Sequence, residues 1–499
     1  MSAHLDSGTI RAMEHLASFR KNIIGNDESV PGPYGSHRLV YADWIASGRL
    51  YRPIEERMTE LVGPWTANTH SESSHLGQAM TIAYREARER LRKEVNASAD
   101  DVVLPVGSGM TGAVSKLQRM LGLKIPENLS GRLALAENER PVVFITHMEH
   151  HSNHTSWLET LADVVVLPPD EQLLTDPREL EKALDKYRDR PLKIGSFTAA
   201  SNVTGIRVPY RELARIMHRA GGYCFVDFAA SAPYDRIDMQ GGDPSERLDA
   251  VYFSPHKYLG GPGSPGILAF NKELYHNRVP DQPGGGTVLW TNPWKEHSYI
   301  ADIESREDGG TPAFLQTIKA ALACSLKESM SVDAIHKAES VLIPRALEGL
   351  KAIPKVRVLA GDKTDRIGAI SFYMQDVHFN LAVRLLSDRF GIQTRGGCSC
   401  AGTYGHYLLA VDRDTSRRIT CSINAGDLTE KPGWIRASIH PTMSLADIDF
   451  LVSSIAETAE RAGEWAADYR FLPDEADWRH ASWDSRKAAA IKGLWKPFD

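Results

Sequence analysis

Cysteine is scarce in this chain, and long apolar runs and a marked excess of either charge are missing. Its 499 residues include 5 cysteines, an odd number that argues against a disulfide framework and favours a reducing compartment. No apolar run approaches the roughly 20 residues that a membrane-spanning helix needs. Lys and Arg total 58 against 64 Asp and Glu, so the net charge of -6 offers no basic surface for nucleic acid or anionic lipid. The N-terminal stretch also lacks the apolar core of a secretory signal, and we expect a soluble, cytoplasmic protein.

The rest of the composition is that of a globular protein with more than one domain. Hydrophobic residues make up 42% of the chain, and a length of about 150 residues per domain predicts two or three structural units. In the first two-thirds, short runs rich in β-branched residues alternate with amphipathic stretches, which is typical of an α/β domain with a mostly parallel sheet. The predicted strands are 102–106, 142–146, 164–167, 192–197, 223–227, 250–253 and 267–270, and helices are predicted at 111–121, 177–187 and 209–220.

The pattern changes after residue 330 and predicts a smaller α+β domain. Its expected helices are 331–353, 380–390 and 444–461, its expected strands are 356–359, 367–373 and 434–439, and Gly402 to Thr429 is expected to form a long loop. The tail from Gly463 holds four of the 10 tryptophans, so we expect it to pack on the body or on a partner subunit. The predicted division is an N-terminal arm (1–38), a large domain (39–325), a small C-terminal domain (326–462) and a Trp-rich extension (463–499).

Residues of unusual chemistry follow four of the predicted strands. Asp227 ends one strand, and Lys257, His150 and Asn202 follow three others. Ligands of open α/β sheets bind outside the carboxyl ends of the strands, so we expect these groups in one crevice. Pyridoxal phosphate requires a lysine for a Schiff base, a carboxylate that keeps the pyridine nitrogen protonated, and a flat side chain that stacks on the ring. Gly107–Thr111, between a strand and a helix, offers backbone N–H groups for its phosphate.

Each feature alone has an ordinary structural explanation. An aspartate at a strand end is most often a turn or cap residue. The segment Gly107-Ser108-Gly109 lacks both the lysine of a Walker loop and the third glycine of a dinucleotide fingerprint. The histidines within 147–154 are not accompanied by a cysteine or carboxylate pattern that completes a zinc site, so no metal is expected. The joint placement of the groups therefore carries the cofactor prediction.

Five short segments are more specific, because together they resemble the motifs of a known family. They read YADWIAS (41–47), MEHHSN (148–153), SNVTG (201–205), SPHK (254–257) and EDGGTP (307–312). In this order they resemble the YLDxAAS, EHHxN, SNxxG, SxHK and FExGTP motifs of class V, fold type I pyridoxal-phosphate enzymes of the cysteine desulfurase and selenocysteine lyase group. The resemblance extends from about Tyr41 to Ile455. It implies the fold type I transferase architecture and pyridoxal 5'-phosphate as cofactor.

The resemblance also implies a role for each matching residue. Lys257 would form the Schiff base, Asp227 would pair with the pyridine nitrogen, and His150 would stack on the ring as a catalytic residue. Asn202 would contact the cofactor or the amino-acid substrate. Arg436, in the segment GWIRAS, matches the arginine that holds the substrate carboxylate, a bidentate task suited to a guanidinium.

The phosphate ligands implied by the resemblance come from two subunits. Within one subunit they would be Ser108, Gly109, Ser254 and His256. Thr311 and Gly286 would reach the phosphate from the neighbouring subunit. The resemblance therefore implies an obligate homodimer with shared active sites.

One thiol decides the implied reaction. The segment RGGCSCA (395–401) is similar to the RxGxxCA segment of one desulfurase branch, and Cys400 takes the nucleophile position. Cys400 would remove sulfur from L-cysteine, or selenium from a relative, as a persulfide, release alanine and serve a sulfur-acceptor protein. Cys398 would relay or trap sulfur. In the alternative both are incidental loop thiols, whereas Cys224 and Cys324 match packing residues.

Departures from the family pattern leave other functions open. The DGAQ segment of desulfurases is DFAA (227–230) here, so Ala230 replaces the glutamine that contacts the ring hydroxyl. The YNT segment after the arginine is HPT (440–442). One alternative is a class V aminotransferase, epimerase or C–S lyase that needs no thiol. Another is a partner-binding scaffold with a structural cofactor.

Overall fold

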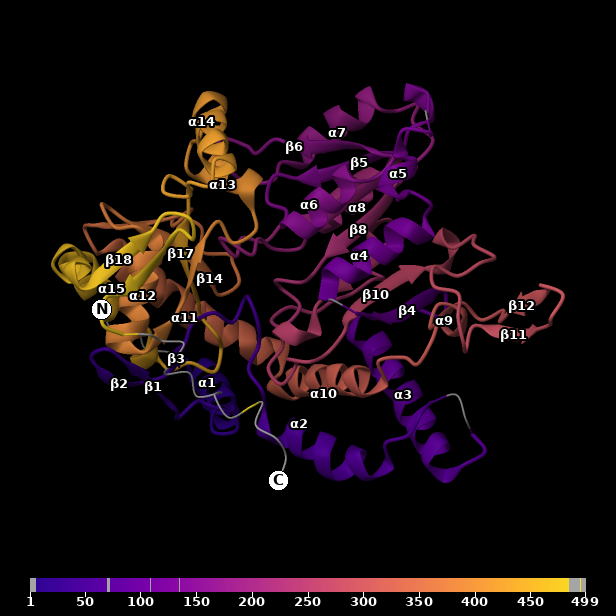
Figure 1. Cartoon of the computed structure of the whole chain (residues 1–499), viewed down its shortest axis with the longest axis horizontal. Coiled ribbons are helices and arrows are strands. Elements are labelled where there is room, and N and C mark those ends of the chain that lie inside the picture. The colour runs from indigo at the N-terminus through magenta and orange to yellow at the C-terminus, as the bar shows by residue number, and fades with distance from the viewer. Residues whose placement is uncertain (1–5, 70–71, 108, 134, 484–493, 495–499) are drawn as a thin grey trace. The chain divides into compact units, whose positions relative to one another are not determined.

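The computed structural model describes residues 6–69, 72–107, 109–133, 135–483 and 494 (Figure 1). The chain divides into a large unit, residues 46–202 and 206–335, and a small unit, residues 1–45, 203–205 and 336–499. The four segments expected from the sequence stay a prediction. Ser108, one of the expected phosphate ligands, and Trp495 lie outside the described residues. No helix among the described residues is long and apolar enough to cross a membrane.

The large unit contains a seven-stranded mixed sheet. Its order is β4-β10-β9-β8-β7-β5-β6, with parallel pairing from β9 to β6 and β10 antiparallel to both of its neighbours. The strands are β4 (Asp101–Val106), β5 (Val142–Thr146), β6 (Asp163–Leu167), β7 (Lys193–Thr198), β8 (Tyr223–Asp227), β9 (Ala250–Phe253) and β10 (Gly266–Asn271). Strands such as β5 and β9 are fully buried, and β-branched and aromatic side chains stand on both of their faces, as is typical of a sheet that is covered on both sides. The predicted mostly parallel α/β fold is confirmed.

Helices pack against this sheet and against one another (Figure 1). They are α2 (Arg52–Glu56), α3 (His75–Glu94), α4 (Gly109–Met120), α5 (Glu127–Ser130), α6 (His151–Leu158), α7 (Pro177–Lys186), α8 (Tyr210–Arg219), α9 (Ile303–Arg306) and α10 (Phe314–Met330). The start of α7 shows how sequence sets a boundary, because Asp176 accepts the N–H of Arg178 and Pro177 takes the first position. The main core gathers Leu117, Trp157 and Phe225 between helices and sheet.

The small unit contains a four-stranded antiparallel sheet of order β13-β14-β17-β16. Its strands are β13 (Val356–Val358), β14 (Ala369–Met374), β16 (Arg395–Gly397) and β17 (Trp434–Ser438). Its helices include α1 (Ser7–Arg20), α12 (Phe379–Phe390), α15 (Leu445–Trp465) and, from residue 336, α11 (Val332–Lys351). A hairpin of β1 (Ser29–Gly32) and β2 (Gly35–Arg38) precedes β3 (Val40–Tyr41), which pairs in parallel with β15 (Ile392–Gln393). The α+β character expected of this part is present.

The stretch from Gly402 to Thr429 corrects the sequence analysis. It was expected to be a long loop, but it contains α13 (Gly402–Leu408) and α14 (Arg413–Asn424). The Asp412 carboxylate caps α14 by accepting the N–H of Thr415 at 2.8 Å. Helix α14 buries none of its residues, and its only large aliphatic side chains, Ile419 and Ile423, lie one turn apart, a pattern too short to predict a helix.

The Trp-rich tail begins with an antiparallel hairpin of β18 (Tyr469–Leu472) and β19 (Asp477–His480). The hairpin packs on α12 within the small unit. Asn380 Nδ2 donates to the carbonyl of Ala476 at 2.6 Å, and Arg384 Nε donates to that of Trp478 at 3.1 Å. Up to residue 480, the tail is therefore part of the small unit's body.

Candidate active site

Asp227 and Lys257 follow adjacent strands of the large unit, β8 and β9. The Asp227 side chain is buried, and its Oδ1 accepts the N–H of Ala229 at 2.7 Å. Burial raises the pKa of Asp227 to about 6, against the lowering effects of that hydrogen bond and of the positive Lys257. The structure thus brings the two predicted residues within electrostatic reach, and it leaves a buried carboxylate that a cationic ring nitrogen would suit.

A backbone cradle lies at the start of α4. Ser254 Oγ accepts the N–H of Met110 at 2.8 Å, which satisfies one of the unpaired donors of the first turn. Gly109 has a φ of +62°, and a Cβ there would lie 3.0 Å from Ser254 Oγ and 3.8 Å from His256 Cδ2. A Cβ at Gly266 would lie 2.0 Å from the Gly109 carbonyl oxygen, so only glycine permits this approach. Gly109, Ser254 and His256 therefore lie close together at the start of α4, and their contact with a phosphate stays a prediction.

His150 is the N-cap of α6. Its Nδ1 accepts the N–H of Ser152 at 3.1 Å, so in the neutral ring the proton is assigned to Nε2. The hydroxyls of Ser152 and Thr111 are 2.7 Å apart, which joins the first turns of α6 and α4. The predicted stacking residue is therefore linked to the start of α4 through Ser152 and Thr111.

Glu149, beside His150, is a buried carboxylate that sequence reasoning did not single out. It accepts hydrogen bonds from Thr146 Oγ1 and Asn153 Nδ2, both at 2.7 Å, and from the N–H of Thr198 at 2.9 Å. Burial raises the pKa of Glu149 to about 8 against the effect of these hydrogen bonds. The carboxylate joins the ends of β5 and β7 to α6 and so fixes the position of His150. Only its place in the EHH motif pointed to it.

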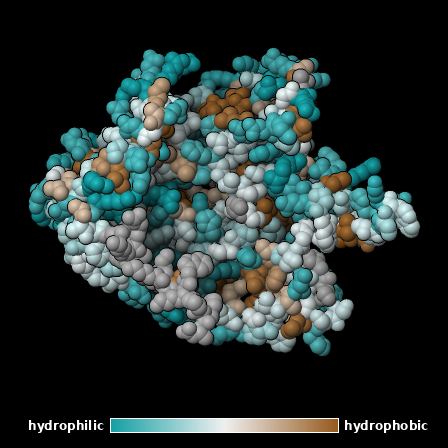
Figure 2. All heavy atoms as spheres, viewed as in Figure 1, coloured by the Kyte–Doolittle hydropathy of each residue, from teal (hydrophilic) through white to brown (hydrophobic). Residues whose placement is uncertain are grey.

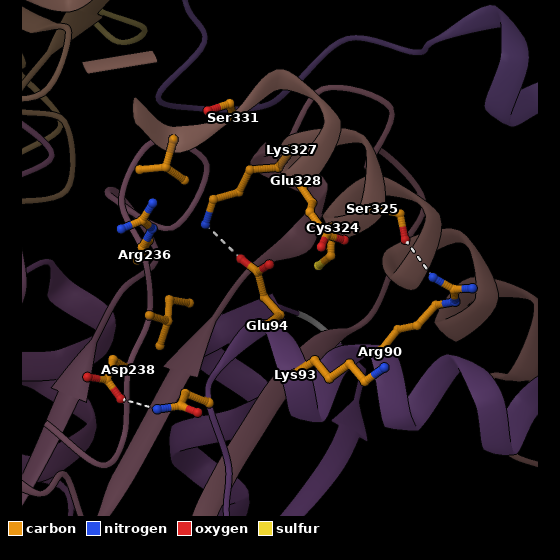
Figure 3. Close-up of a pocket in the computed structure, with 13 residues that line it drawn as sticks. Arg90, Lys93, Glu94, Arg236, Asp238, Cys324, Ser325, Lys327, Glu328 and Ser331 are labelled. Carbon is orange, nitrogen blue, oxygen red and sulfur yellow. Dashed lines mark hydrogen bonds and ion pairs between the residues drawn. The ribbon is translucent and has the colours of Figure 1, made fainter. Parts of the chain in front are cut away.

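A buried ion pair supports the residue that follows Lys257. Glu94 Oε1 accepts from Tyr258 Oη at 2.9 Å and from Lys327 Nζ at 2.7 Å, and Lys327 also donates to the carbonyl of Asp235 at 2.5 Å. Figure 3 shows Lys327 and Glu94 pointing toward each other from α10 and α3. They line a cavity of about 660 Å³ whose other charged residues include Arg90, Lys93 and Arg236. The sequence carried no local signal for this support.

Two exposed loops bring Gly286 and Thr311 close together in the large unit. The N–H of Gly310 donates to the carbonyl of Gly285 at 2.8 Å, and both predicted residues are exposed. Between them in the chain lies the hairpin of β11 (Val288–Thr291) and β12 (His297–Tyr299), on which Leu289 and Trp294 are 67% and 78% exposed. The surface over β11 includes hydrophobic (brown) atoms in Figure 2. Their reach toward a neighbouring subunit stays a prediction.

In the small unit, Arg436 is held by a carboxylate. Arg436, on β17, is 2% exposed, and its Nη2 donates to Asp43 Oδ1 at 2.9 Å. The other oxygen, Asp43 Oδ2, accepts from Arg395 Nε at 3.1 Å. Arg395 and Arg436 are register partners on β16 and β17. The candidate substrate arginine therefore belongs to a row of three charged groups that the sequence did not reveal.

Cys400 lies in a tight turn directly after β16. The N–H of Ala401 donates to the carbonyl of Cys398 at 3.0 Å, and Ser399 and Cys400 have φ values of +51° and +56°. Positive φ at both central residues is typical of a type I′ turn, which glycine and asparagine favour, and it costs about 1 kcal/mol per residue of other types. Trp434 Nε1 stabilises the turn by donating to Ser399 Oγ at 3.2 Å. Cys400 is exposed and Cys398 is half-buried.

Cys224, Cys324 and the two positions that depart from the family pattern are buried, whereas Cys421 is exposed. Cys224 and Cys324 are buried, and burial raises the pKa of each, as fits packing residues. Ala230 is buried. His440 stacks on Trp44 with ring centroids 3.9 Å apart, and burial lowers its pKa to about 3.

Two further predictions concern Asn202 and metal binding. Asn202 is buried, with 7% of its surface exposed, and it is the last residue of the first chain segment of the large unit. Its role stays a prediction. Within the described ranges, no group of three or more His, Cys, Asp or Glu side chains is placed to hold a metal ion.

Comparisons with known proteins agree on one family. Residues 40–451 match the model of the family described as "Aminotransferase class-V". The chain is 28% identical over 433 residues to a probable cysteine desulfurase of Halalkalibacterium halodurans, covering 85% of this chain and 94% of the relative. It is 27% identical over 370 residues to a probable cysteine desulfurase of Streptomyces coelicolor, covering 74% and 84%.

Solved structures show the same fold. A cysteine desulfurase of Thermococcus onnurineus has a TM-score of 0.70 at 22% identity, covering 89% of this chain and 98% of the other. The cysteine desulfurase CsdA of Escherichia coli has a TM-score of 0.69 at 23% identity with the same coverage. The family resemblance and the fold type I architecture predicted from the sequence are confirmed.

Proposed function

This chain belongs to the aminotransferase class-V family, whose members typically use pyridoxal phosphate, and we propose that it removes sulfur from L-cysteine, or selenium from a relative. The observation that carries the proposal is the exposed Cys400 thiol, held in a turn that begins directly after the strand of Arg395. Ser399 and Cys400 both have positive φ, which residues other than glycine adopt rarely and which clusters at functional sites, and this supports the proposal. The distant relatives called probable cysteine desulfurases support it.

The residues of the large unit fit pyridoxal phosphate. Lys257 would bind its aldehyde carbon, the buried Asp227 would pair with its ring nitrogen, and His150 would stack on its ring. Gly109, Ser254 and His256 would hold its phosphate at the start of α4. When bound, the cofactor would accept the electron pair released at the substrate's Cα.

The chain's own residues would carry out the remaining steps. Arg436 would bind the carboxylate of the amino acid, and the amine of Lys257 would take the proton from Cα. The Cys400 thiolate would attack the substrate's sulfur, so that an S–S bond forms on Cys400 as the Cβ–S bond breaks. The electron pair of the broken bond ends in a C–H bond of alanine. An acceptor thiolate would then attack the outer sulfur, so that an S–S bond forms on the acceptor as the S–S bond on Cys400 breaks and the Cys400 thiolate is restored.

We also propose a homodimer with shared active sites. The exposed apolar side chains of the β11–β12 hairpin support it, because patches of this kind usually mark interfaces. Thr311 and Gly286, on loops joined by the hydrogen bond between Gly310 and Gly285, would contact the partner's phosphate. A sulfur-acceptor protein would dock where Cys400 is exposed.

The test is incubation of the purified, cofactor-loaded protein with L-cysteine and a reductant, followed by identification of the amino-acid product. Alanine with an equal amount of sulfide is expected. Pyruvate with ammonia would instead show a C–S lyase, and no turnover of L-cysteine would exclude sulfur removal from this amino acid.

One observation favours a second candidate, a class V aminotransferase, epimerase or C–S lyase that uses no thiol. Ala230, in place of the glutamine of desulfurases, offers no hydrogen-bonding side chain to the ring. The Cys400→Ala variant separates the candidates. A desulfurase loses alanine formation and keeps the visible absorbance of its cofactor, whereas the second candidate keeps its activity.

A further inference from the structure

Asp43 connects two arginines within the small unit. Its Oδ1 lies 2.9 Å from Arg436 Nη2 and its Oδ2 lies 3.1 Å from Arg395 Nε. The three side chains differ in exposure: Arg436 is 3% exposed, Asp43 16% and Arg395 48%. The row thus runs from a buried cation through a nearly buried anion to a cation in contact with solvent.

A buried guanidinium requires a counter-charge, because an unpaired ion in a region of low dielectric is strongly unfavourable. Asp43 meets this requirement for Arg436. However, Asp43 alone would also cancel the charge that Arg436 needs in order to attract a substrate carboxylate. The charges of Asp43 and Arg436 sum to zero, so the substrate carboxylate would gain no net attraction and would be repelled by the Asp43 carboxylate.

Arg395 removes this conflict. With it, the three groups carry one net positive charge, which matches a single α-carboxylate. The pairing of β16 with β17 fixes the geometry, since Arg395 and Arg436 are register partners and Asp43 bonds to both. Asp43 comes from the YADWIAS segment, in which no local pattern assigns it a chemical role.

We propose that Asp43 and Arg395 are positioning residues for the substrate carboxylate. Asp43 orients the Arg436 guanidinium, and Arg395 offsets the negative charge of Asp43 so that the row attracts one carboxylate. The inference rests on the proposed function in one respect, namely that Arg436 binds the substrate.

The test measures the Kd of L-alanine from the change it causes in the visible absorbance of the cofactor-loaded protein, together with KM and kcat for L-cysteine. Alanine binding needs no thiol chemistry, so this readout does not depend on Cys400. Arg395→Gln should raise Kd and KM about tenfold with little change in kcat, because one charge near the carboxylate is lost. Arg395→Lys, which keeps the charge, should stay within about threefold of the wild-type Kd.

The double variant Arg395→Gln/Asp43→Asn decides between charge balance and a merely structural role. The asparagine amide oxygen still accepts from Arg436, and the net charge of the row returns to its wild-type value. Its Kd should therefore recover to within about threefold of wild type. Arg395→Gln/Asp43→Ala should bind more weakly than the asparagine double variant, because the orienting acceptor is gone.

A matched control is Arg345→Gln, which removes an exposed arginine of the same unit that pairs with Asp449 at 2.9 Å. It should leave Kd unchanged. An unchanged Kd in Arg395→Gln, or a double variant that binds no better than Arg395→Gln, would overturn the inference alone. An unchanged Kd in Arg436→Gln would show that Arg436 does not hold the carboxylate, and the inference would fall together with that part of the proposed function.

Discussion

Replacing Asp227 with asparagine should stabilise the cofactor-free protein at neutral and alkaline pH. Burial raises the pKa of Asp227 from its ordinary value of 3.8 to about 6, so the ionised carboxylate is disfavoured in the fold. Because the folded state holds its proton more tightly than the unfolded chain, stability falls as pH rises from about 4 to about 6 and stays lower above that. Asparagine keeps an oxygen that can accept the N–H of Ala229 and carries no charge.

The size of the effect follows from the pKa difference. Two pKa units at about 1.4 kcal/mol each give a gain of about 3 kcal/mol at pH 8 and almost none at pH 4. For the large unit, an unfolding entropy of about 2.1 cal/mol/K per residue converts this gain to an increase of about 5 °C in Tm. Thermal unfolding of the cofactor-free wild type and of Asp227→Asn at both pH values measures it.

Adding pyridoxal phosphate should reverse the order at pH 8. The cofactor stabilises whichever protein binds it more tightly, and only the wild type offers a negative charge to the ring nitrogen. Asp249→Asn serves as a control, since Asp249 is a buried carboxylate that already accepts from Cys224 N and His218 Nε2, both at 2.8 Å. This control should lower Tm. The reasoning is refuted if Asp227→Asn is less stable than wild type without cofactor at pH 8, or if its gain is equal at both pH values.

Three further predictions address other parts of the chain. Gly266→Ala places a Cβ 2.0 Å from the Gly109 carbonyl and should weaken cofactor binding about tenfold in a fluorescence titration; an unchanged Kd would contradict the close approach. Lys116 Nζ lies 2.6 Å from the buried Glu307 carboxylate, and Lys116→Met removes this cation. The free energy of unfolding, measured in urea, should fall by about 3–5 kcal/mol, and a fall below about 1 kcal/mol would contradict the pairing. His440, whose pKa burial lowers to about 3, should make the wild type lose about 2 kcal/mol between pH 7 and pH 5, because only the unfolded chain takes up the proton. His440→Phe should lose less over that range, and an equal loss would rule out His440 as the cause.

The strands of the large sheet are predictable from the sequence because burial on both faces produces continuous β-branched and aromatic runs. The strands β5, β8 and β9 begin and end at the expected residues. The placement of Asp227 and Lys257 side by side follows from the same logic, since both come at the carboxyl ends of neighbouring parallel strands.

Features that depend on distant pairing were not predictable. Asp43 acquires its role only when β16 and β17 pair beside it, and no local pattern announces that pairing. The ion pair between Glu94 and Lys327 joins two helices that are far apart in the chain, and each residue alone is typical of a solvated helix face. Helix α14 was not predicted for a different reason, namely that none of its residues is buried in a core.

The most direct test of the central claim is the mass of the peptide that contains Cys400 after one turnover with L-cysteine in the absence of reductant. The account predicts one added sulfur atom on Cys400 and one alanine per active site. The same alanine should form in Cys398→Ala, and none should form in Cys400→Ala, although that variant keeps its cofactor absorbance. Alanine formation at the wild-type rate by Cys400→Ala, or an unmodified Cys400 after turnover, would contradict the account.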